Sequence, residues 1–600
     1  MSVVARLSLL VPPLLISGCA NSGVPAFPGE TPDPLEPVNR RIWAANETLL
    51  HNVVQPVGKS YRAAVPEPVR QSIRNVGRNA SSPGRLLNEM LQGRWSDLSS
   101  ETARFLTNST IGLAGLRDPA TSFGIAMPRA DFNQTFRSWG ASPSTYLILP
   151  GLGPSDNIAF PSYLADHAVE PWWYFDSPYD KGWVGVTAAE LADESEVMAE
   201  LLKTEPDAYQ SVRLFVAYAN RAGQPDWSLN GPVHDPTFET LAASSAAPDD
   251  PRFGEKSREF AVKLSTTGKR LPFNLWLQNK PAPLVYIVPG LRSHRLSGQV
   301  LGQAEKLYRE GYSVVTITAS FHPEFMKLAL TAPLPGEAAS TSQDLVVVLK
   351  SIDDLLSKRF TDQITERSLM GFSMGAFQTL RLAAMEEESG LRFDHYLAIN
   401  PPVDLITAAR SLDAFALAPL EWPAEERAAR IENTLHKTVL LARNPKKAVT
   451  DPYEGAESKL LVGLFFKSTL RTVIFESQLR ENFGILKAPL NKWHREPAYR
   501  EIDQFTFLDY YNQFVTPYHL AQGKSRAEME QAKSLRFLSQ KLRGNSRVRV
   551  IHSANDFLLS PADHRWLKST FRSRLIMFPR GGHLGSLLTE PVQKAVLKSL

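Results

Sequence analysis

The sequence contains a single cysteine, Cys19, among its 600 residues. One cysteine excludes an intrachain disulfide and any zinc site built from cysteine ligands. We find no motif that requires a metal or a cofactor, and we expect neither.

A strong charge of one sign is also missing. The formal net charge is +4 and no long run of Lys or Arg occurs, which excludes a nucleic-acid partner. No segment reaches 18 uninterrupted apolar residues, so no transmembrane helix is expected. With 43% hydrophobic residues the chain is too apolar for disorder, and its length predicts two or more domains.

The position of the cysteine carries more information than its number. A short apolar run at 7–16 follows a basic residue, which is the layout of a secretory signal. The stretch "LISGC" (15–19) resembles the bacterial lipobox, which implies cleavage before Cys19 and a lipid on its thiol. The residue after the cysteine is Ala20 and not Asp, and by the resemblance this implies that the lipoprotein is sorted to the outer membrane. The alternative is an ordinary signal peptide with an incidental cysteine.

Composition changes twice along the chain. Residues 33–225 carry apolar residues at helical spacing, in segments ended by Pro or Gly. A stretch near 223–255 is rich in Pro, Gly, Ala and acidic residues, which indicates a domain boundary. Beyond it, runs such as "PLVYIVPG" (283–290) alternate with helical segments, which predicts a mostly parallel sheet with helices on both faces.

The strand pattern stops near 404 and resumes with "SRVRVIHSAND" (546–556). The segment between is mostly helical, so we predict a large helical cap inserted over the carboxyl edge of the sheet. The expected organisation is a multidomain chain: signal peptide 1–18, lipid-anchored tether 19–32, mainly α-helical domain 33–225, linker 226–255, and α/β domain 256–600 with cap insertion 404–540.

One predicted helix in the first half carries a stripe of arginines. In "PEPVRQSIRNVGRN" (66–79), Arg70, Arg74 and Arg78 recur every four residues along one face. Such a face can lie among lipid phosphates in a membrane interface. From the pattern alone, the ordinary solvated face of a soluble helix is the favoured alternative.

The stretch "LMGFSMGAF" (369–377) places Ser373 between two glycines, where a predicted strand turns into a helix. At such a turn, Gly371 and Gly375 avoid collisions with neighbouring backbone and leave the serine hydroxyl exposed. The strand before, the helix after and the parallel alternation around it favour a nucleophile over a chance turn.

A nucleophilic serine needs a base and an acid that orients the base. His583 follows the last predicted strand, in "PRGGHLGS", and Asp556 follows the strand before it. The order Ser373, Asp556, His583 is the order found in α/β-hydrolases. Asp404, just past an earlier strand, is the alternative acid.

Two further histidines, His552 in a predicted strand and His564 in a helix, are expected to be structural. The backbone N–H groups of Met374 and Leu291 are the expected oxyanion donors. Residues 256–600 thus resemble the α/β-hydrolase superfamily. This resemblance implies catalysis by a nucleophilic serine but does not identify the substrate.

The first half resembles the MlaA (VacJ) lipoproteins of the Gram-negative outer membrane over residues 33–225. The resemblance rests on seven blocks in family order: "DPLEPVNRRIWAAN" (33–46), "QPVGKSYRAAVPEPVRQSIRNV" (55–76), "LNEMLQGRW" (87–95), "ARFLTNSTIGLAGLRDPA" (103–120), "DFNQTFRSWG" (131–140), "YLILPGLGPS" (146–155) and "PDAYQSVRLFVAYANR" (206–221). Asn133 replaces a usual glycine, and "GPSDN" lacks the Arg-Asp that often follows the serine.

The resemblance implies a ring of helices in the outer membrane, beside porins, that passes misplaced phospholipid toward a periplasmic carrier. It also implies that the stripe of Arg70, Arg74 and Arg78 lies in the membrane interface and not in solvent. Phospholipid or lysophospholipid acyl esters are then the natural substrates of a tethered serine hydrolase or acyltransferase. Two alternatives stay open: a transport component whose hydrolase-like half is non-catalytic and binds a partner, and an anchored esterase for a non-lipid ester.

Overall fold

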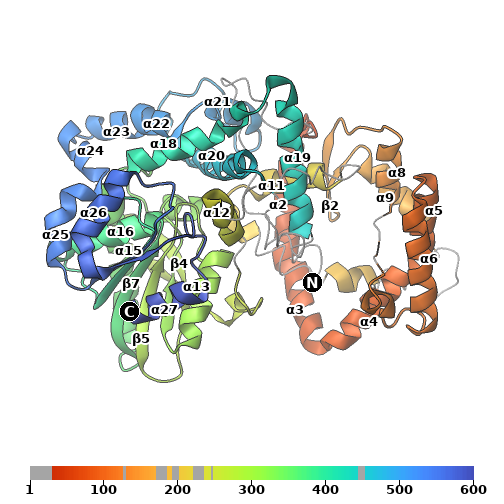
Figure 1. Ribbon diagram of the computed structural model, residues 1–600, viewed down its shortest axis with the longest axis horizontal. Coiled ribbons are helices and arrows are strands. Elements are labelled where there is room, and N and C mark those ends of the chain that lie inside the picture. Colours follow the sequence, from red (N-terminus) through yellow and green to blue (C-terminus); the bar gives the residue numbers. More distant parts are fainter. Residues whose placement is uncertain are drawn as a thin grey trace. The chain divides into compact units, whose positions relative to one another are not determined.

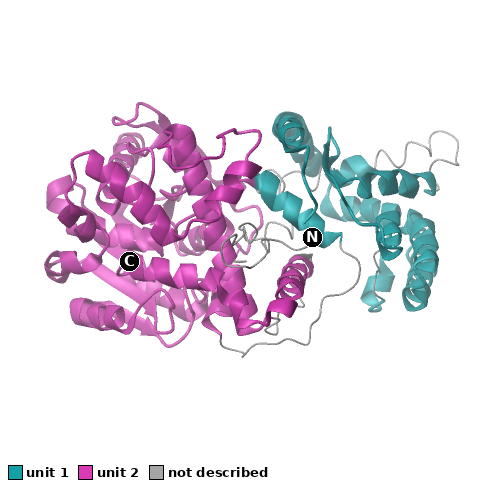
Figure 2. Ribbon diagram, turned by 90° about the horizontal axis from the view of Figure 1, so that it is seen from above, with its two compact units in different colours: residues 1–8, 29–202, 208–225 teal, residues 9–28, 203–207, 226–600 magenta. Residues whose placement is uncertain are grey.

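A computed structural model describes residues 30–125, 127, 130–170, 186–191, 202–220, 235–244, 247–443 and 453–600. They fall into two compact units, coloured separately in Figure 2. The amino-terminal unit holds the described residues of 30–202 and 208–220, and the carboxyl-terminal unit holds 203–207 and those of 235–600. The predicted signal peptide and Cys19 lie outside the described residues.

The amino-terminal unit is mainly helical, as predicted. Its elements are α2 (Glu36–Leu49), η1 (Leu50–Val54), α3 (Gln55–Ala64), α4 (Glu67–Ala80), α5 (Ser82–Leu91), α6 (Trp95–Thr110), α7 (Pro119–Ser122), α8 (Phe132–Ser138), α9 (Ala159–Ala168) and α11 (Ala208–Ala219). Figure 1 shows α3 to α6 following one another around an arc. A short antiparallel hairpin, β1 (Tyr146–Leu149) and β2 (Gly153–Asp156), interrupts the helices.

Buried polar residues are frequent in the amino-terminal unit. Its hydrophobic cluster of Tyr146, Ile148 and Tyr209 is small, whereas Glu89 and Glu101 are fully buried. Each buried carboxylate has an arginine partner, Arg94 for Glu89 and Arg85 for Glu101, which offsets the cost of burying its charge. Large apolar side chains lie at the surface instead: Val57, Trp95, Leu106, Ile111, Leu113, Phe123 and Trp139.

The carboxyl-terminal unit is built on an eight-stranded sheet of order β10-β9-β8-β7-β5-β6-β4-β3. The strands are β3 (Arg258–Lys263), β4 (Arg270–Trp276), β5 (Ala282–Val288), β6 (Ser313–Thr316), β7 (Ile364–Phe372), β8 (His395–Ile399), β9 (Val548–Ser553) and β10 (Leu575–Phe578). Only β4 among these strands runs antiparallel to both neighbours. This order is that of the α/β-hydrolase fold, and it confirms the predicted fold class.

Helices cover both faces of this sheet (Figure 1). On one face, α13 (Gly298–Arg309) and α27 (Glu590–Ser599) pack against the buried side chains of β5, β7 and β8. On the other face lie α15 (Ala338–Arg359) and α16 (Met374–Ala384). Consecutive residues of β5 are buried because both of its faces are covered.

The segment between β8 and β9 is helical, as predicted for the cap. Its elements are α18 (Leu405–Ala416), η5 (Ala418–Glu421), α19 (Ala424–Arg443), α20 (Gly455–Arg480), α21 (Glu496–Ile502), α22 (Phe507–Asp509), η7 (Tyr510–Val515), α23 (Thr516–Ala521), α24 (Arg526–Ala532), η8 (Leu535–Leu538) and α25 (Ser539–Gly544). Helix α20 is buried along most of its length, and its Arg471 pairs with Asp503. Among the described residues, no helix has the length and hydropathy needed to cross a membrane.

Two elements differ from the sequence interpretation. Residues 236–244, inside the stretch taken as a linker, form helix α12 (Pro236–Ser244), which belongs to the carboxyl-terminal unit. The hairpin β3–β4 begins the sheet but is not recognised in the sequence. Strand β3 is a half-exposed edge strand with charged residues at both ends, so it lacks a clear apolar pattern.

Candidate active site

Ser373 lies at the turn between β7 and α16, as predicted. Its backbone has φ 56° and ψ −124°, a strained conformation for a residue other than glycine. A Cβ on Gly371 would lie 2.2 Å from the carbonyl oxygen of Gly375, and one on Gly375 would lie 2.0 Å from that of Val288. The two flanking glycines are therefore required for the close approach of strand, turn and helix.

The structure brings the three predicted triad residues together. Nε2 of His583 lies 2.7 Å from Oγ of Ser373, and Nδ1 of His583 lies 2.9 Å from Oδ2 of Asp556. All three side chains are buried. This is the geometry in which an imidazole can take the serine proton while a carboxylate fixes its orientation.

Asp556 is held in its ionised form. Burial raises its pKa, but the interactions with His583, His552 and Asn400 together outweigh burial and hold the pKa below its usual value. Asn400 donates a 2.8 Å hydrogen bond to Oδ2, and the backbone N–H of Leu558 donates one of 3.0 Å to Oδ1. The sequence interpretation did not identify Asn400 as a site residue. Asn400 directly follows β8, the strand beside β7, which leads to Ser373.

The alternative acid, Asp404, has another role in the structure. Its carboxylate accepts hydrogen bonds from the N–H groups of Ile406 and Thr407 and so caps α18. His552 is buried behind the triad, with Nε2 3.7 Å from Oδ2 of Asp556. Burial lowers the pKa of His552 to about 4, so its ring is neutral at pH 7. The half-buried His564 also has a lowered pKa because of burial.

The two expected oxyanion donors lie beside the serine. Met374 is the first residue of α16, so its N–H precedes the intrahelical bonds. Leu291 follows Gly290, whose added Cβ would lie 3.3 Å from Cβ of Ser373. Within the described part of the chain, neither N–H has a recorded hydrogen-bond acceptor.

Two cavities meet at Ser373. One is almost wholly apolar and is lined by α18 and the α22–η7 segment, with Leu412, Phe466 and Phe507 among its walls. The other has a mixed lining, in which Thr240, Gln299 and Arg292 lie beside apolar side chains such as Phe465 and Leu584. Arg292 is buried there and donates hydrogen bonds to Ser468 and Glu205, both at 2.6 Å.

The arginine stripe of the amino-terminal unit is not uniform. Arg70 and Arg74 both pair with Glu67 on the same helix, and both guanidinium groups contribute to lowering the pKa of Glu67 against the effect of burial. Arg78 is exposed and lines a polar cavity between α4, α5 and α6.

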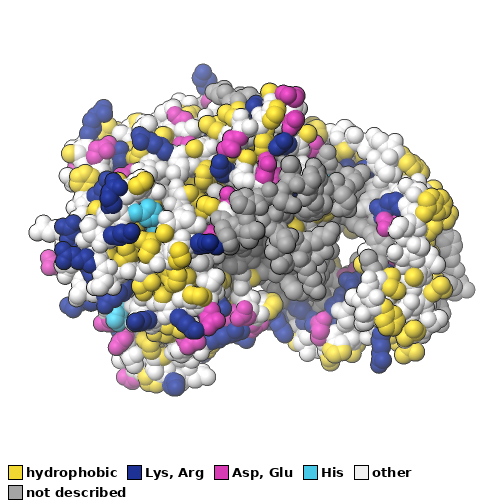
Figure 3. Space-filling model, viewed as in Figure 1, with side chains coloured by type: hydrophobic (Ala, Val, Ile, Leu, Met, Phe, Trp, Pro, Cys, Tyr) yellow, Lys and Arg dark blue, Asp and Glu magenta, His cyan; other side chains and the backbone are white. Residues whose placement is uncertain are grey.

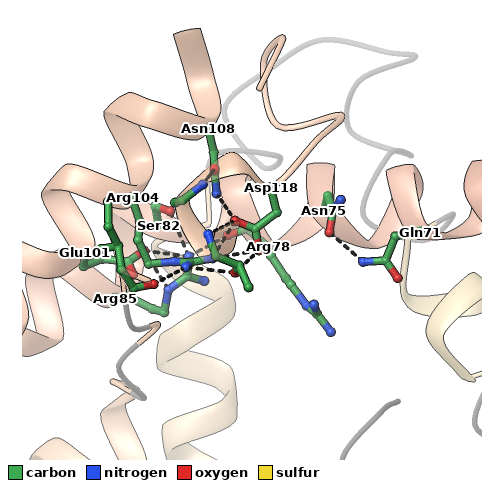
Figure 4. A network of polar contacts seen from close by, with 12 residues as sticks. Gln71, Asn75, Arg78, Ser82, Arg85, Glu101, Arg104, Asn108 and Asp118 are labelled. Atoms are coloured by element: carbon green, nitrogen blue, oxygen red, sulfur yellow. Dashed lines mark hydrogen bonds and ion pairs between the residues drawn. The ribbon is translucent and has the colours of Figure 1, made fainter. Parts of the chain in front are cut away.

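Figure 4 shows the network of polar contacts among residues that line this cavity. Arg85 binds Glu101, and Arg104 binds Asp118 through two hydrogen bonds of 3.0 and 2.9 Å. Asn108 donates a further 3.0 Å hydrogen bond to Asp118. In this network the buried Glu101 and the partly exposed Asp118 both have partners, and in Figure 4 the side chain of Arg78 extends away from them.

Comparison with known sequences finds relatives of the amino-terminal part of the chain. Residues 31–222 match the family model of the MlaA lipoprotein. The intermembrane phospholipid transport system lipoprotein MlaA of Haemophilus influenzae is 27% identical over 213 residues, 34% of this chain and 85% of that protein. The Escherichia coli protein of the same name is 33% identical over 146 residues, 23% of this chain and 56% of that protein.

Solved structures also align with each part. A structure described as the basis for maintenance of bacterial outer-membrane lipid asymmetry aligns at 26% identity and TM-score 0.29, over 32% of this chain and 97% of that one. The Pyrococcus furiosus esterase Pf2001 aligns at 13% identity and TM-score 0.33, over 62% of this chain and 98% of that one. Residues 31–222 thus match the MlaA lipoprotein family model, and the strand order of the carboxyl-terminal unit is that of the α/β-hydrolase fold.

Proposed function

We propose that this protein is a lipid-anchored component of the outer membrane that handles phospholipid and cleaves or transfers acyl esters at Ser373. The observation that carries the enzymatic part is the unbroken hydrogen-bond chain from Ser373 through His583 to Asp556, beside an apolar cavity. Lipid on Cys19 would hold the chain to the membrane, facing the periplasm.

The reaction follows from the positions of these groups. Oγ of Ser373 attacks the ester carbonyl carbon while its proton passes to Nε2 of His583. The N–H groups of Leu291 and Met374 bind the oxyanion of the tetrahedral intermediate. Its collapse breaks the bond to the alcohol, which leaves with the proton from His583. Water, or a second alcohol, then takes the acyl group by the reverse sequence of steps.

The cavities on either side of the serine support an amphipathic ester as the substrate. Only an apolar chain matches the side of Leu412, Phe466 and Phe507, because a polar group buried there would lose its hydration. The side of Thr240 and Gln299 offers polar side-chain groups to a polar alcohol portion. A phospholipid or lysophospholipid has both parts.

The amino-terminal domain supports the membrane part of the proposal. Its surface exposes large apolar side chains such as Trp95, Ile111 and Phe123, and hydrophobic side chains appear on this unit in Figure 3. Exposed side chains of this size and kind are compatible with insertion into a membrane interface. Phospholipid, an outer-membrane porin and a periplasmic lipid carrier are the proposed partners, and covalent linkage raises the effective concentration of delivered lipid at Ser373.

Mass spectrometry of products from defined phospholipids tests this proposal. The purified full chain is compared with Ser373→Ala and with Ser546→Ala, a matched change at an exposed serine away from the site. Release of fatty acid or lysophospholipid is expected from the parent and from Ser546→Ala only. Equal release by Ser373→Ala rejects the enzymatic part. Turnover of short-chain esters without phospholipid indicates an esterase for another substrate.

The non-catalytic alternative predicts a different result. A fluorophosphonate probe labels a serine only when a functional base activates it. Labelling of the parent at Ser373 is expected. Absence of labelling, together with a lipid-asymmetry defect in cells that lack residues 33–225, would assign the protein to transport alone.

A further inference from the structure

Helix α12 holds the turn that carries the catalytic histidine. Oε2 of Glu239 accepts a 2.9 Å hydrogen bond from the backbone N–H of Gly581. Oγ1 of Thr240 accepts one of 2.9 Å from the N–H of His583 itself. Two neighbouring side chains of one helix thus bind the backbone on both sides of Gly582.

The middle N–H of the turn is bound indirectly by the same helix. The N–H of Gly582 donates a 2.9 Å hydrogen bond to Oδ1 of Asn555. The side-chain nitrogen of Asn555 in turn donates a 3.0 Å hydrogen bond to Glu239. All three successive N–H groups of the turn are therefore satisfied by side chains, and Glu239 takes part in the binding of two of them.

Close backbone packing accompanies these hydrogen bonds. A Cβ on Gly582 would lie 2.0 Å from the carbonyl oxygen of Pro236, and one on Gly585 would lie 2.6 Å from that of Glu239. Gly582 also has a φ of 51°. The glycines around His583 therefore allow the turn to lie directly on α12.

Helix α12 is itself anchored to the rest of the carboxyl-terminal unit. Asp235 caps it by accepting hydrogen bonds from the N–H groups of Thr237 and Phe238. The ring of Phe238 lies 6.2 Å from that of Tyr453, which precedes α20. Thr240 and Leu241 line the cavity that contains Arg292, so the helix is also part of the wall of the site.

We propose that α12 is a positioning element of the active site, in which Glu239 and Thr240 fix the His583 turn at hydrogen-bonding distance from Ser373. This inference rests on the proposed function, because it assigns a role to residues that act through the catalytic histidine. It places the functional start of the hydrolase domain before α12 and not at residue 256.

Kinetics and hydrogen exchange of full-length variants test the proposal. Thr240→Val keeps the shape of the side chain but removes the acceptor, whereas Thr240→Ser keeps it. We expect Thr240→Val and Glu239→Ala to lower kcat by about tenfold to a hundredfold, because a small displacement of a catalytic group has effects of this size. Thr240→Ser is expected to retain most of kcat. Glu255→Ala, at an exposed glutamate, is the matched control.

Hydrogen exchange of the peptide that contains residues 581–583 gives a readout independent of turnover. Faster exchange is expected in Thr240→Val and Glu239→Ala, but not in Glu255→Ala, at unchanged melting temperature. Unchanged exchange in both variants overturns the proposal, as does an equal loss of kcat in Thr240→Val and Thr240→Ser. If the parent protein hydrolyses no ester, the proposed function fails and the exchange rates still decide the role of α12. If Glu239→Ala does not fold, the Thr240 pair decides.

Discussion

The side-chain amide of Asn400 donates its hydrogen bond to Oδ2 of Asp556, the same oxygen that His583 contacts. The two donors reach this oxygen from different parts of the chain, Asn400 at the end of β8 and His583 after β10. Asn400 has a φ of 47°, so its backbone adopts a left-handed conformation to make this contact. The orientation of the acid therefore depends on a residue outside the triad.

Asn400→Ala is expected to lower kcat/KM by about tenfold or more, because a hydrogen bond to a charged group contributes about 1.5–3 kcal/mol. The Asn400 hydrogen bond lowers the pKa of Asp556, so the variant raises that pKa. Since ionised Asp556 contributes stability that is lost as pH falls through its folded pKa, acid unfolding is expected at a higher pH. Steady-state kinetics and an acid titration check this, with Asn482→Ala at an exposed asparagine as control.

Two aspartates distinguish a catalytic acid from a helix cap. Asp556→Asn is expected to lower kcat by about 10³-fold to 10⁴-fold, because the amide fixes the wrong tautomer of the histidine. Asp404→Asn is expected to leave kcat within about twofold, since an asparagine still caps a helix. The opposite ranking in steady-state assays would make Asp404 the acid.

The stability of the carboxyl-terminal unit is expected to depend on His552 in mildly acidic solution. The pKa of His552 is lowered from 6.5 to about 4 by burial, so the unfolded chain binds a proton that the folded chain does not. Stability is fully present above pH 6.5 and falls as pH decreases from 6.5 toward 4. The loss between pH 7 and pH 5 is about 2 kcal/mol. Urea unfolding measures it, and His552→Gln is expected to show a smaller loss. An identical pH slope in the variant contradicts the assignment.

The length of the acyl chain accepted at Ser373 is expected to depend on Ala409, which lines the apolar cavity. Ala409→Trp fills part of that cavity, so hydrolysis of long-chain esters should fall at least tenfold while acetyl esters are still cleaved. Ala414→Trp, at an exposed position of the same helix, is the control. Chain-length profiles measure the effect, and a parallel loss for short and long chains would contradict it.

The arginines of α4 are expected to differ in their effect on lipid handling. Arg78→Gln removes an exposed charge that lines the polar cavity, and transfer of fluorescent phospholipid between vesicles is expected to slow by about tenfold. Arg70→Gln changes a charge already offset by Glu67, so a smaller effect is expected. Equal effects of the two variants would show that the stripe acts as a whole.

The sequence predicted the parallel part of the sheet and the candidate triad residues because their signals are local and ordered. Buried strands give short apolar runs, and the elbow around Ser373 needs glycines at fixed offsets. The positions of Asp556 and His583 then follow from the order of strands. These predictions required no knowledge of packing between distant segments.

The contacts around the triad could not be predicted in this way. Asn400 and Glu239 act through hydrogen bonds to residues 156 and 342 positions away, and no local pattern marks such partners. Helix α12 lies in a stretch whose Pro, Gly and Ser content is typical of a linker. Its role is visible only in the structure, where Gly582 and Gly585 beside His583 pack against its backbone.

The assignment of residues 203–207 to the carboxyl-terminal unit has a consequence for shortening the chain. Glu205 binds Arg292, and the hydroxyl of Tyr499 donates a 2.7 Å hydrogen bond to Asp207. Residues 208–220, which follow directly, include Tyr209 of the amino-terminal cluster. Because the polypeptide alternates between the two units, a single cut cannot excise either one intact. Truncation after residue 202 removes Tyr209 from the amino-terminal cluster. Truncation after residue 220 leaves Glu205 and Asp207 without Arg292 and Tyr499, their partners.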